Sequence, residues 1–289
     1  MIGSGPAHAL DNHQAAAASP ALPARPWTEV PASALTAVLG VMTDIDDTLT
    51  RDGAIEPAAL AALQGLRDGG VPVIAITGRP MGWSERFAHE WPVAAIVAEN
   101  GAVALVPQGD AVRVEFAQEE SVRRANAERL RAVAARVLRE VSGATLARDS
   151  AGRVTDIAID HSEFAHLDAA AIERVVALMR AEGMSATVSS IHVNGWFGAH
   201  DKWSGGCWMV QRLFGRDLAT ELGRWIYVGD STNDQLMFER FALAVGVANL
   251  RRFAAELVVW PAYLTGGERG EGFAEVARAV LAARAAAGR

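Results

Sequence analysis

Residues 37–49 read AVLGVMTDIDDTL, and this stretch sets the expectation for the fold. Its apolar part, residues 37–43, predicts a short buried strand. Asp44 and Asp46 follow two residues apart, so both carboxylates leave the strand at its carboxyl end. In a parallel sheet the carboxyl ends of the strands form the binding crevice, which is where we expect these side chains. The same residues also suit a loop that caps the next helix, because Asp and Thr are common in turns.

Two more apolar runs repeat this pattern. Residues 71–76 lead into Thr77 and Gly78, and residues 94–98 lead into Asn100 after one glutamate. Stretches with helical spacing separate the runs, as in a parallel sheet that is covered by helices. We therefore predict an α/β fold whose core is a Rossmann-like, doubly wound parallel sheet.

The middle of the chain has a different pattern. Two short strands, a long Arg-rich helix, a strand with one polar face and a second helix are predicted there, which is an α+β order. After this segment the alternation of helices and strands resumes. We predict a core made of residues 34–102 and 193–289, and an inserted α+β domain at residues 103–192. Residues 1–33, rich in Ala, Pro and Ser, are expected to form a disordered tail.

Polar residues mark three further positions in the predicted core. The Thr77 hydroxyl and the Gly78 amide suit a phosphate oxygen. Lys202 starts the first core helix after the insertion and can neutralise a phosphate. Residues 229–234, GDSTND, close another strand with carboxylate and amide oxygens, which are ligands that Mg²⁺ prefers. Each feature alone also fits a plain structural role: a strand-end turn, a surface lysine and a helix N-cap.

The spacing of Asp44 and Asp46 allows the two carboxylates different tasks. One aspartate can attack a phosphorus atom and form an aspartyl phosphate. The other can protonate the leaving oxygen and then activate water. The chain carries 27 Lys and Arg against 34 Asp and Glu, so an anionic phosphate would need a cation beside these carboxylates.

Together these features resemble the signature of the haloacid dehalogenase superfamily. The DIDDTL sequence at residues 44–49 resembles its first motif, Thr77 its second, Lys202 its third and GDSTND its fourth. The insertion between the second and third motifs is similar to the type II (C2) cap. Residues 98–102, AENGA, resemble the sequence before the cap in subfamily IIB, which includes sugar-phosphate phosphatases and phosphomannomutases. Many sugar phosphatases of that branch carry Lys-Gly at the third motif, where this chain has Lys-Trp.

The resemblance implies a role for each matched residue. Asp44 would be the nucleophile and a metal ligand, and Asp46 the general acid and base with its backbone carbonyl on the metal. Asp230 would bind Mg²⁺ directly. The remaining matched residues would support the metal site (Asn233 and Asp234) or hold the phosphoryl group (Thr77, Gly78 and Lys202).

Three residues outside the motifs are further candidates for contact with the substrate. Arg79 follows Gly78, but it also suits the exposed start of a helix. Asn100 suits the floor of the site, but also a left-handed turn before glycine. Asn194 lies where the chain returns to the core, in a segment that can equally be a packed turn.

We expect an enzyme, a Mg²⁺-dependent phosphatase of a small phosphate monoester such as a sugar phosphate. The alternatives are a phosphomutase with the same aspartyl-phosphate chemistry and a non-catalytic phosphate-binding module. The insertion is expected to supply specificity and to hinge near Asn100 and Asn194. The core alone would then still hydrolyse a small generic ester.

Composition narrows the partners and the location. The net charge is −7 and no basic run stands out, so we do not expect a nucleic-acid surface. No apolar run is long enough for a transmembrane helix, and no membrane partner is expected. The single cysteine, Cys207, excludes an intramolecular disulfide and fits a reducing cytoplasm. The expected partner is a small phosphorylated metabolite.

Overall fold

The computed structural model describes residues 24–288. Most of the tail expected at residues 1–33 lies outside this range. The rest of that prediction is wrong, because residues 24–33 are packed on the core: β1 (Arg25–Pro26) pairs with β15 (Tyr263–Leu264), and Trp27 is buried. The sequence around Trp27 shows neither helical nor strand periodicity. Burial of the large Trp27 ring nevertheless stabilises the packing of this segment on the core.

The central sheet carries the core of the fold. Within the described residues it has nine strands in the order β1-β15-β14-β13-β2-β5-β6-β7-β8. Read in this order, the strands from β1 through β2 to β6 pair in parallel. The last two strands, β7 and β8, pair in antiparallel fashion. Besides β1 and β15, the strands of this sheet are β2 (Gly40–Thr43), β5 (Val73–Ile76), β6 (Ala95–Ala98), β7 (Val103–Gln108), β8 (Ala111–Phe116), β13 (Trp225–Gly229) and β14 (Leu243–Gly246).

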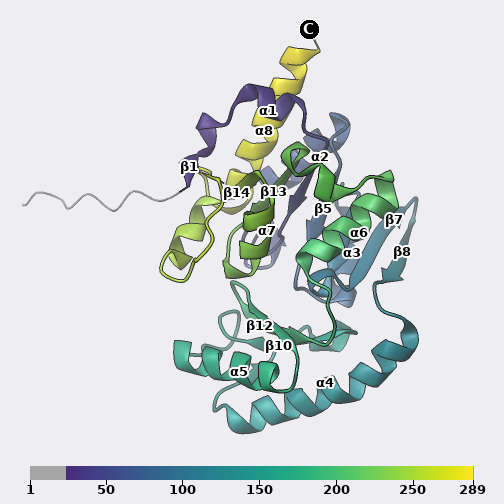
Figure 1. The fold of residues 1–289 in the computed structure, drawn as a ribbon, viewed down its shortest axis with the longest axis vertical. Helices are drawn as coiled ribbons and strands as arrows, with labels where there is room; N and C mark the ends of the chain where they lie inside the picture. The colour runs from purple at the N-terminus through teal and green to yellow at the C-terminus, as the bar shows by residue number, and fades with distance from the viewer. Residues whose placement is uncertain (1–23, 289) are drawn as a thin grey trace, which may run out of the picture.

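Helices cover both faces of this sheet (Figure 1). Along β2, Val41 belongs to one hydrophobic cluster and Met42 to the other, because successive side chains of a strand point to opposite faces. Both faces are therefore apolar, as is typical of a parallel sheet between helices. The doubly wound α/β prediction is confirmed. The helices are α1 (Ala32–Thr36), α2 (Pro57–Asp68), α3 (Met81–Glu90), α6 (Lys202–Phe214), α7 (Gln235–Arg240) and α8 (Arg269–Ala287).

Close packing inside the sheet depends on one glycine. Gly40 of β2 lies opposite Trp225 of β13. A Cβ atom at Gly40 would come within 2.3 Å of the Trp225 ring. Only glycine lets this ring cover the start of β2, which is the strand that leads into Asp44.

The predicted boundaries of the insertion need correction. The two strands predicted at its start are the hairpin of β7 and β8, which extends the core sheet: Leu105 pairs with Ile96 of β6 and is fully buried. The cap therefore begins after Phe116 rather than at residue 103. It also includes β12 (His192–Trp196), so the core resumes after residue 196. An antiparallel pattern does not tell which sheet a hairpin joins, and only the pairing with β6 decides it.

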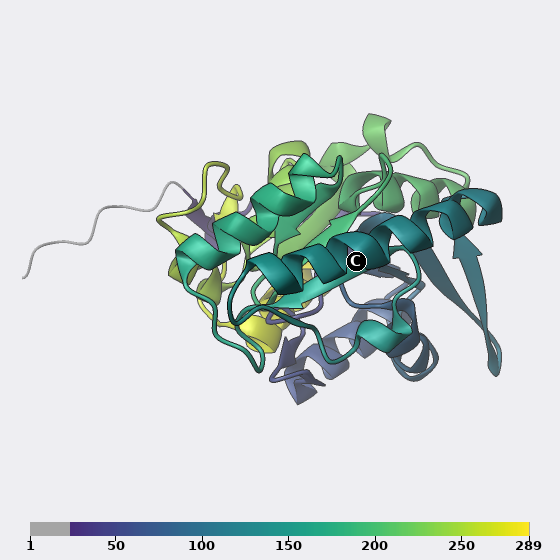
Figure 2. The same ribbon diagram turned by 90° about the horizontal axis from the view of Figure 1, so that it is seen from below.

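The cap has a four-stranded antiparallel sheet in the order β11-β12-β10-β9. Two helices cover the face that points away from the core, and Figure 2 views the cap from this side. Their apolar residues and those of the sheet form a hydrophobic cluster of the cap's own. The elements are α4 (Glu120–Glu140), β9 (Thr145–Leu146), β10 (Asp156–Asp160), α5 (Ala169–Ala181) and β11 (Ser185–Val188). None of the described helices is long and apolar enough to span a membrane.

Candidate active site

The predicted carboxylates lie at the carboxyl ends of adjacent strands. Asp44 directly follows β2 and Asp230 directly follows β13, and these strands pair in parallel with Thr43 opposite Val228. The Asp44 amide donates to the Val228 carbonyl at 2.8 Å, which continues the ladder beyond the strand. Asp44 and Asp230 are both buried. Sheet geometry therefore brings together two motifs that are far apart in the sequence.

Lys202 connects the first and fourth motifs. Its Nζ donates to Asp44 Oδ1 at 2.6 Å and to Asp234 Oδ1 at 2.7 Å. It is the first residue of α6, whose N-terminus is fixed by a capping box between Asp201 and Ser204. Burial raises the pKa of Asp44 to about 8, against the opposing effect of Lys202. One lysine thus does not compensate fully for the carboxylates around it.

Asp234 and Asn233 hold the fourth motif in place. Both oxygens of Asp234 already have partners: Oδ1 accepts from Lys202 and from the Tyr227 hydroxyl, and Oδ2 accepts from the Asp230 and Ser231 amides. Asn233 is half-buried, and its Oδ1 accepts from the Ser231 hydroxyl. These bonds fix the loop that presents Asp230, and a supporting role of both residues at a metal stays a prediction.

The buried carboxylates fit a hard cation. Asp44, Asp230 and Asp234 each offer an oxygen, and these oxygens lie within 4.8 Å of one another. Burial, followed by the neighbouring Asp44 and Asp234, raises the pKa of Asp230 well above its usual range. A divalent cation among oxygen ligands relieves this repulsion, and Mg²⁺ prefers such ligands. Each Asp234 oxygen already accepts two hydrogen bonds, whereas Asp230 Oδ1 accepts only one, at 3.3 Å from the Thr48 hydroxyl, so Asp44 and Asp230 fit the part of direct ligands better.

The Asp46 side chain points to a different group, Arg79. The Arg79 Nε lies 3.0 and 3.1 Å from the two Asp46 oxygens. Its Nη2 donates to Glu163 at 2.8 Å and its Nη1 to Asp149 at 3.2 Å, and both of these carboxylates belong to the cap. Arg79 has only 5 % of its side chain exposed. It is therefore a buried bridge between the domains rather than a surface residue at a helix start.

The predicted phosphate loop, Thr77 and Gly78, directly precedes Arg79 in the chain. Thr77 is buried, and its Oγ1 accepts from the Arg79 amide at 3.0 Å. Gly78 packs against two amides: a Cβ atom there would approach Asn194 Oδ1 to 3.1 Å and Asn100 Oδ1 to 3.3 Å. Asn100 takes a left-handed conformation with a φ of 55°, and its Nδ2 is buried with no partner among the described residues. Asn100 and Asn194 thus surround the loop instead of the open part of the site.

A pocket of about 330 Å³ opens between core and cap beside Asp46. Of the predicted substrate contacts, Arg79 lines this pocket, whereas Asn100 and Asn194 do not. Hydroxyl groups of the cap, from Ser162 and Ser190, form part of the wall. The charged residues of the lining are Asp46, Asp47, Asp52, Arg79, Glu163, Arg252 and Arg269.

Two of these charged residues, Arg252 and Arg269, belong to no sequence motif that would mark them as part of a site. Arg252 donates to Asp47 at 2.8 Å and to Asp230 at 3.0 Å, and Arg269 donates to Asp47 at 2.8 Å. Although burial opposes it, the two arginines hold the pKa of Asp47 below its usual range. Asp47 belongs to the first motif, but its partners are single arginines about 200 residues away. Nothing in their local sequence distinguishes them from exposed arginines.

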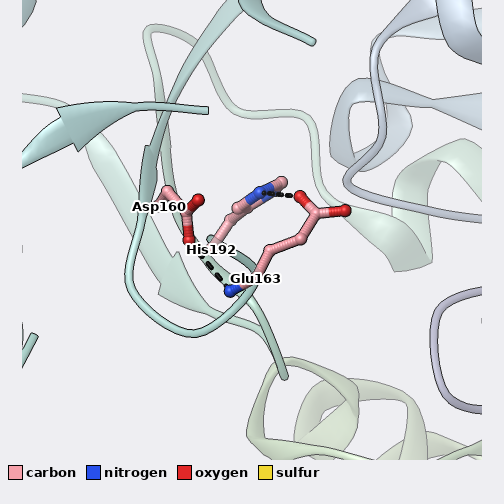
Figure 3. A group of neighbouring side chains, drawn as sticks. All are labelled: Asp160, Glu163 and His192. Atoms are coloured by element: carbon pink, nitrogen blue, oxygen red, sulfur yellow. Dashed lines mark hydrogen bonds and ion pairs between the residues drawn. The ribbon is translucent and has the colours of Figure 1, made fainter. Parts of the chain in front are cut away.

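The cap contributes a cluster of Asp160, Glu163 and His192, drawn in Figure 3. His192 Nε2 lies 2.9 Å from Glu163 Oε2. The Asp160 oxygens accept from the backbone amides of Glu163, Phe164 and Ala165, so they fix the turn on which Glu163 sits. Each side chain of this cluster already has protein partners. We therefore interpret it as the support that directs Glu163 toward Arg79, not as a second metal site.

This bridge leads to a prediction about stability in acid. Although burial opposes the shift, His192 and Arg79 lower the pKa of Glu163 from 4.5 to about 2. A carboxyl with a lowered pKa stabilises the fold above its unfolded pKa, and this contribution disappears as the pH falls from about 4.5 to about 2. The free energy of unfolding of the wild type should therefore fall more steeply over this range than that of Glu163→Gln, as measured by urea denaturation.

Glu239→Gln is the control for this comparison, because Glu239 is a solvent-exposed glutamate on α7 of the core domain. It should keep the pH dependence of the wild type. Parallel curves for the wild type and Glu163→Gln would contradict the ionised bridge between Glu163 and Arg79.

Comparisons with known proteins find one family model and several solved structures of similar fold. The family model for haloacid dehalogenase-like hydrolase matches residues 41–128. No curated protein matches the chain. A solved protein of Thermoplasma acidophilum is 14% identical with a TM-score of 0.65, and the match covers 84% of this chain and 98% of the other.

Two solved structures that match the chain carry a named activity. Sucrose-phosphatase from Synechocystis, solved with sucrose and phosphate, is 17% identical with a TM-score of 0.59 over 84% of this chain and 97% of its own. The C-terminal domain of trehalose-6-phosphate phosphatase from C. albicans is 13% identical with a TM-score of 0.63 over 91% and 99%. At these identities the likeness establishes the fold, and a cap between the second and third motifs is consistent with subfamily IIB. The family model covers residues 41–128 and the solved structures share the fold over most of the chain, so this chain is similar to the haloacid dehalogenase-like hydrolases.

Proposed function

We propose that the chain is a Mg²⁺-dependent phosphatase that hydrolyses a small phosphate monoester through an aspartyl phosphate. The observation that carries this proposal is the buried group of Asp44, Lys202 and Asp230 at the carboxyl ends of β2 and β13. It combines a nucleophile, a fixed positive charge and oxygen ligands for a cation. Asp44 and Asp230 would hold the Mg²⁺. The ion would offset the repulsion between carboxylate and phosphate.

The proposed reaction has two steps. A carboxylate oxygen of Asp44 attacks phosphorus, the bond from phosphorus to the ester oxygen breaks, and Asp46 gives its proton to the leaving alcohol. Asp46 then takes a proton from water, whose oxygen attacks phosphorus and releases phosphate from Asp44. Lys202, the Thr77 hydroxyl and the Gly78 amide would hold the phosphoryl oxygens throughout.

The pocket supports a polyhydroxy leaving group, such as a sugar. Its carboxylates accept hydrogen bonds from hydroxyl groups, and its serine hydroxyls can donate or accept them. Two solved relatives in fold are sugar-phosphate phosphatases by name. We therefore propose a small phosphorylated metabolite, most simply a sugar phosphate, as the substrate. With one cysteine in the chain, we propose a reducing compartment such as the cytoplasm as its location.

A panel of phosphorylated metabolites tests this function. With Mg²⁺ present, we expect release of inorganic phosphate from p-nitrophenyl phosphate and a higher kcat/KM for at least one sugar phosphate. Formation of an isomeric sugar phosphate from a hexose 1-phosphate, without phosphate release, would indicate a mutase instead. Tight binding of sugar phosphates without any turnover would indicate a binding module.

A further inference from the structure

Two buried side chains of the cap, held by a third, donate to one carbonyl group of the core. Arg153 Nη1 donates to the Gly78 carbonyl oxygen at 2.9 Å, and Asn194 Nδ2 donates to the same oxygen at 3.2 Å. Asp156 accepts from both donors, at 2.9 Å from Arg153 Nη1 and at 3.2 Å from Asn194 Nδ2. The exposed side-chain fraction is 2 % for Arg153 and 0 % for Asp156. Two buried donors are therefore fixed on a single acceptor.

The core holds Arg153 in this place from the other side. Glu99 is fully buried, and its carboxylate accepts from the Val154 amide at 3.1 Å and from the Thr155 amide at 2.6 Å. These residues follow Arg153 directly, so the backbone beside Arg153 is fixed to the core. Arg153 and Asp156 do not line the pocket, whereas Arg79 and Glu163 of the other bridge do. The contact to Gly78 thus joins the two domains.

The held carbonyl acts on the phosphate loop through a rigid peptide unit. The Gly78 oxygen and the Arg79 amide belong to the same planar group, so fixing the oxygen fixes the direction of the N–H. That N–H donates to Thr77 Oγ1 at 3.0 Å. With a lone pair of its oxygen used in this way, the Thr77 hydroxyl is left to donate its own proton. The proton is then available to an oxygen of the phosphoryl group.

We propose that Arg153 and Asn194, held by Asp156, are positioning residues of the cap that orient the Thr77 hydroxyl for binding the phosphoryl group. This inference rests on the proposed function, because it takes the Thr77 loop as the phosphate site. It revises one expectation from the sequence, that the core alone keeps the chemistry on a small ester. In this proposal the cap positions part of the phosphate site and also forms part of the wall of the pocket.

A double-mutant cycle in the 289-residue chain tests the proposal. Dissociation constants for inorganic phosphate are measured by calorimetry with Mg²⁺ for the wild type, Asn194→Ala, Thr77→Val and the double variant. Asn194→Ala should weaken phosphate binding about 10-fold to 100-fold, as is usual for a residue that orients a ligand-binding group. In the Thr77→Val background the same change should have almost no further effect, because the hydroxyl that it orients is gone. Independent, additive losses would overturn the proposal.

Kinetic measurements separate positioning from simple attachment of the cap. If Asn194 orients the phosphate loop, Asn194→Ala lowers kcat/KM equally for p-nitrophenyl phosphate and for sugar phosphates. If it only attaches the cap, the order of preference among sugars changes while phosphate affinity stays at the wild-type value, which would overturn the proposal. Asn126→Ala is the matched control, since Asn126 is a buried asparagine of α4 that bonds to Arg129 within the cap.

A second variant covers the risk that loss of Arg153 alone unfolds the protein. Arg153→Met combined with Asp156→Leu removes both partners of the buried ion pair, and Asp149, the other carboxylate bonded to Arg153, keeps its ion pair with Arg79. The folded double variant should also bind phosphate about 10-fold to 100-fold more weakly, and wild-type affinity in it would contradict the proposal. Phosphate binding needs no turnover. A wild type that binds phosphate but hydrolyses no ester would therefore refute the proposed function. The comparison of phosphate dissociation constants would still test the positioning role.

Discussion

Replacing Asp44 by Asn is expected to abolish turnover and leave the protein folded. The amide keeps the shape of the carboxylate and an oxygen that can accept from Lys202, which lies 2.6 Å from Asp44 Oδ1. It is too weak a nucleophile to attack phosphorus, so the rate of phosphate release should fall by about 10⁴-fold or more. The measurement is phosphate release from p-nitrophenyl phosphate at saturating Mg²⁺.

Stability provides a second readout for the same variant. Burial raises the pKa of Asp44 to about 8, so its negative charge is unfavourable in the metal-free fold. Asp44→Asn should therefore leave the free energy of unfolding without Mg²⁺ unchanged or higher. Asp110→Asn, in the exposed turn between β7 and β8, controls for the chemical change and should keep full activity. Retention of more than about a hundredth of the activity in Asp44→Asn would contradict the assignment of the nucleophile.

Removal of divalent cations should have an equally large effect. Asp44, Asp230 and Asp234 are buried with oxygens within 4.8 Å of one another, and an excess of negative charge remains beside Lys202. Dialysis against a chelator should abolish phosphate release, and added Mg²⁺ should restore it. Asp230→Asn should raise the Mg²⁺ concentration for half-maximal activity at least about tenfold, because the site loses a charged ligand.

Thermal unfolding tests the metal site without any turnover. A ligand that binds only the folded state raises Tm, and at a given concentration the rise is larger for a tighter ligand. Mg²⁺ should therefore raise the Tm of the wild type and have a smaller effect on Asp230→Asn. Asp160→Asn, in the cap cluster, should keep the wild-type response if that cluster binds no metal. Full activity in excess chelator, or an equal Tm shift in Asp230→Asn, would exclude this site.

The sequence was most informative where a local pattern and sheet geometry act together. An apolar run followed at once by carboxylates predicts a strand end, and parallel strands align their carboxyl ends. The structure accordingly brings Asp44, Lys202 and Asp230 together. The same logic failed at residues 103–116, because an antiparallel hairpin can extend the core sheet or begin a new domain with the same pattern.

By itself the sequence determined the doubly wound α/β core, the presence of an inserted α+β cap and the order of the four motifs. Only the tertiary structure decided where the cap begins, that residues 24–33 pack on the core, and which single charged residues meet. Arg79 meets Glu163, and Arg153 meets Gly78, across the boundary between domains. Such contacts join residues with no periodic or local signature. They depend on how two separately patterned domains dock, which burial and charge pairing settle only in the folded chain.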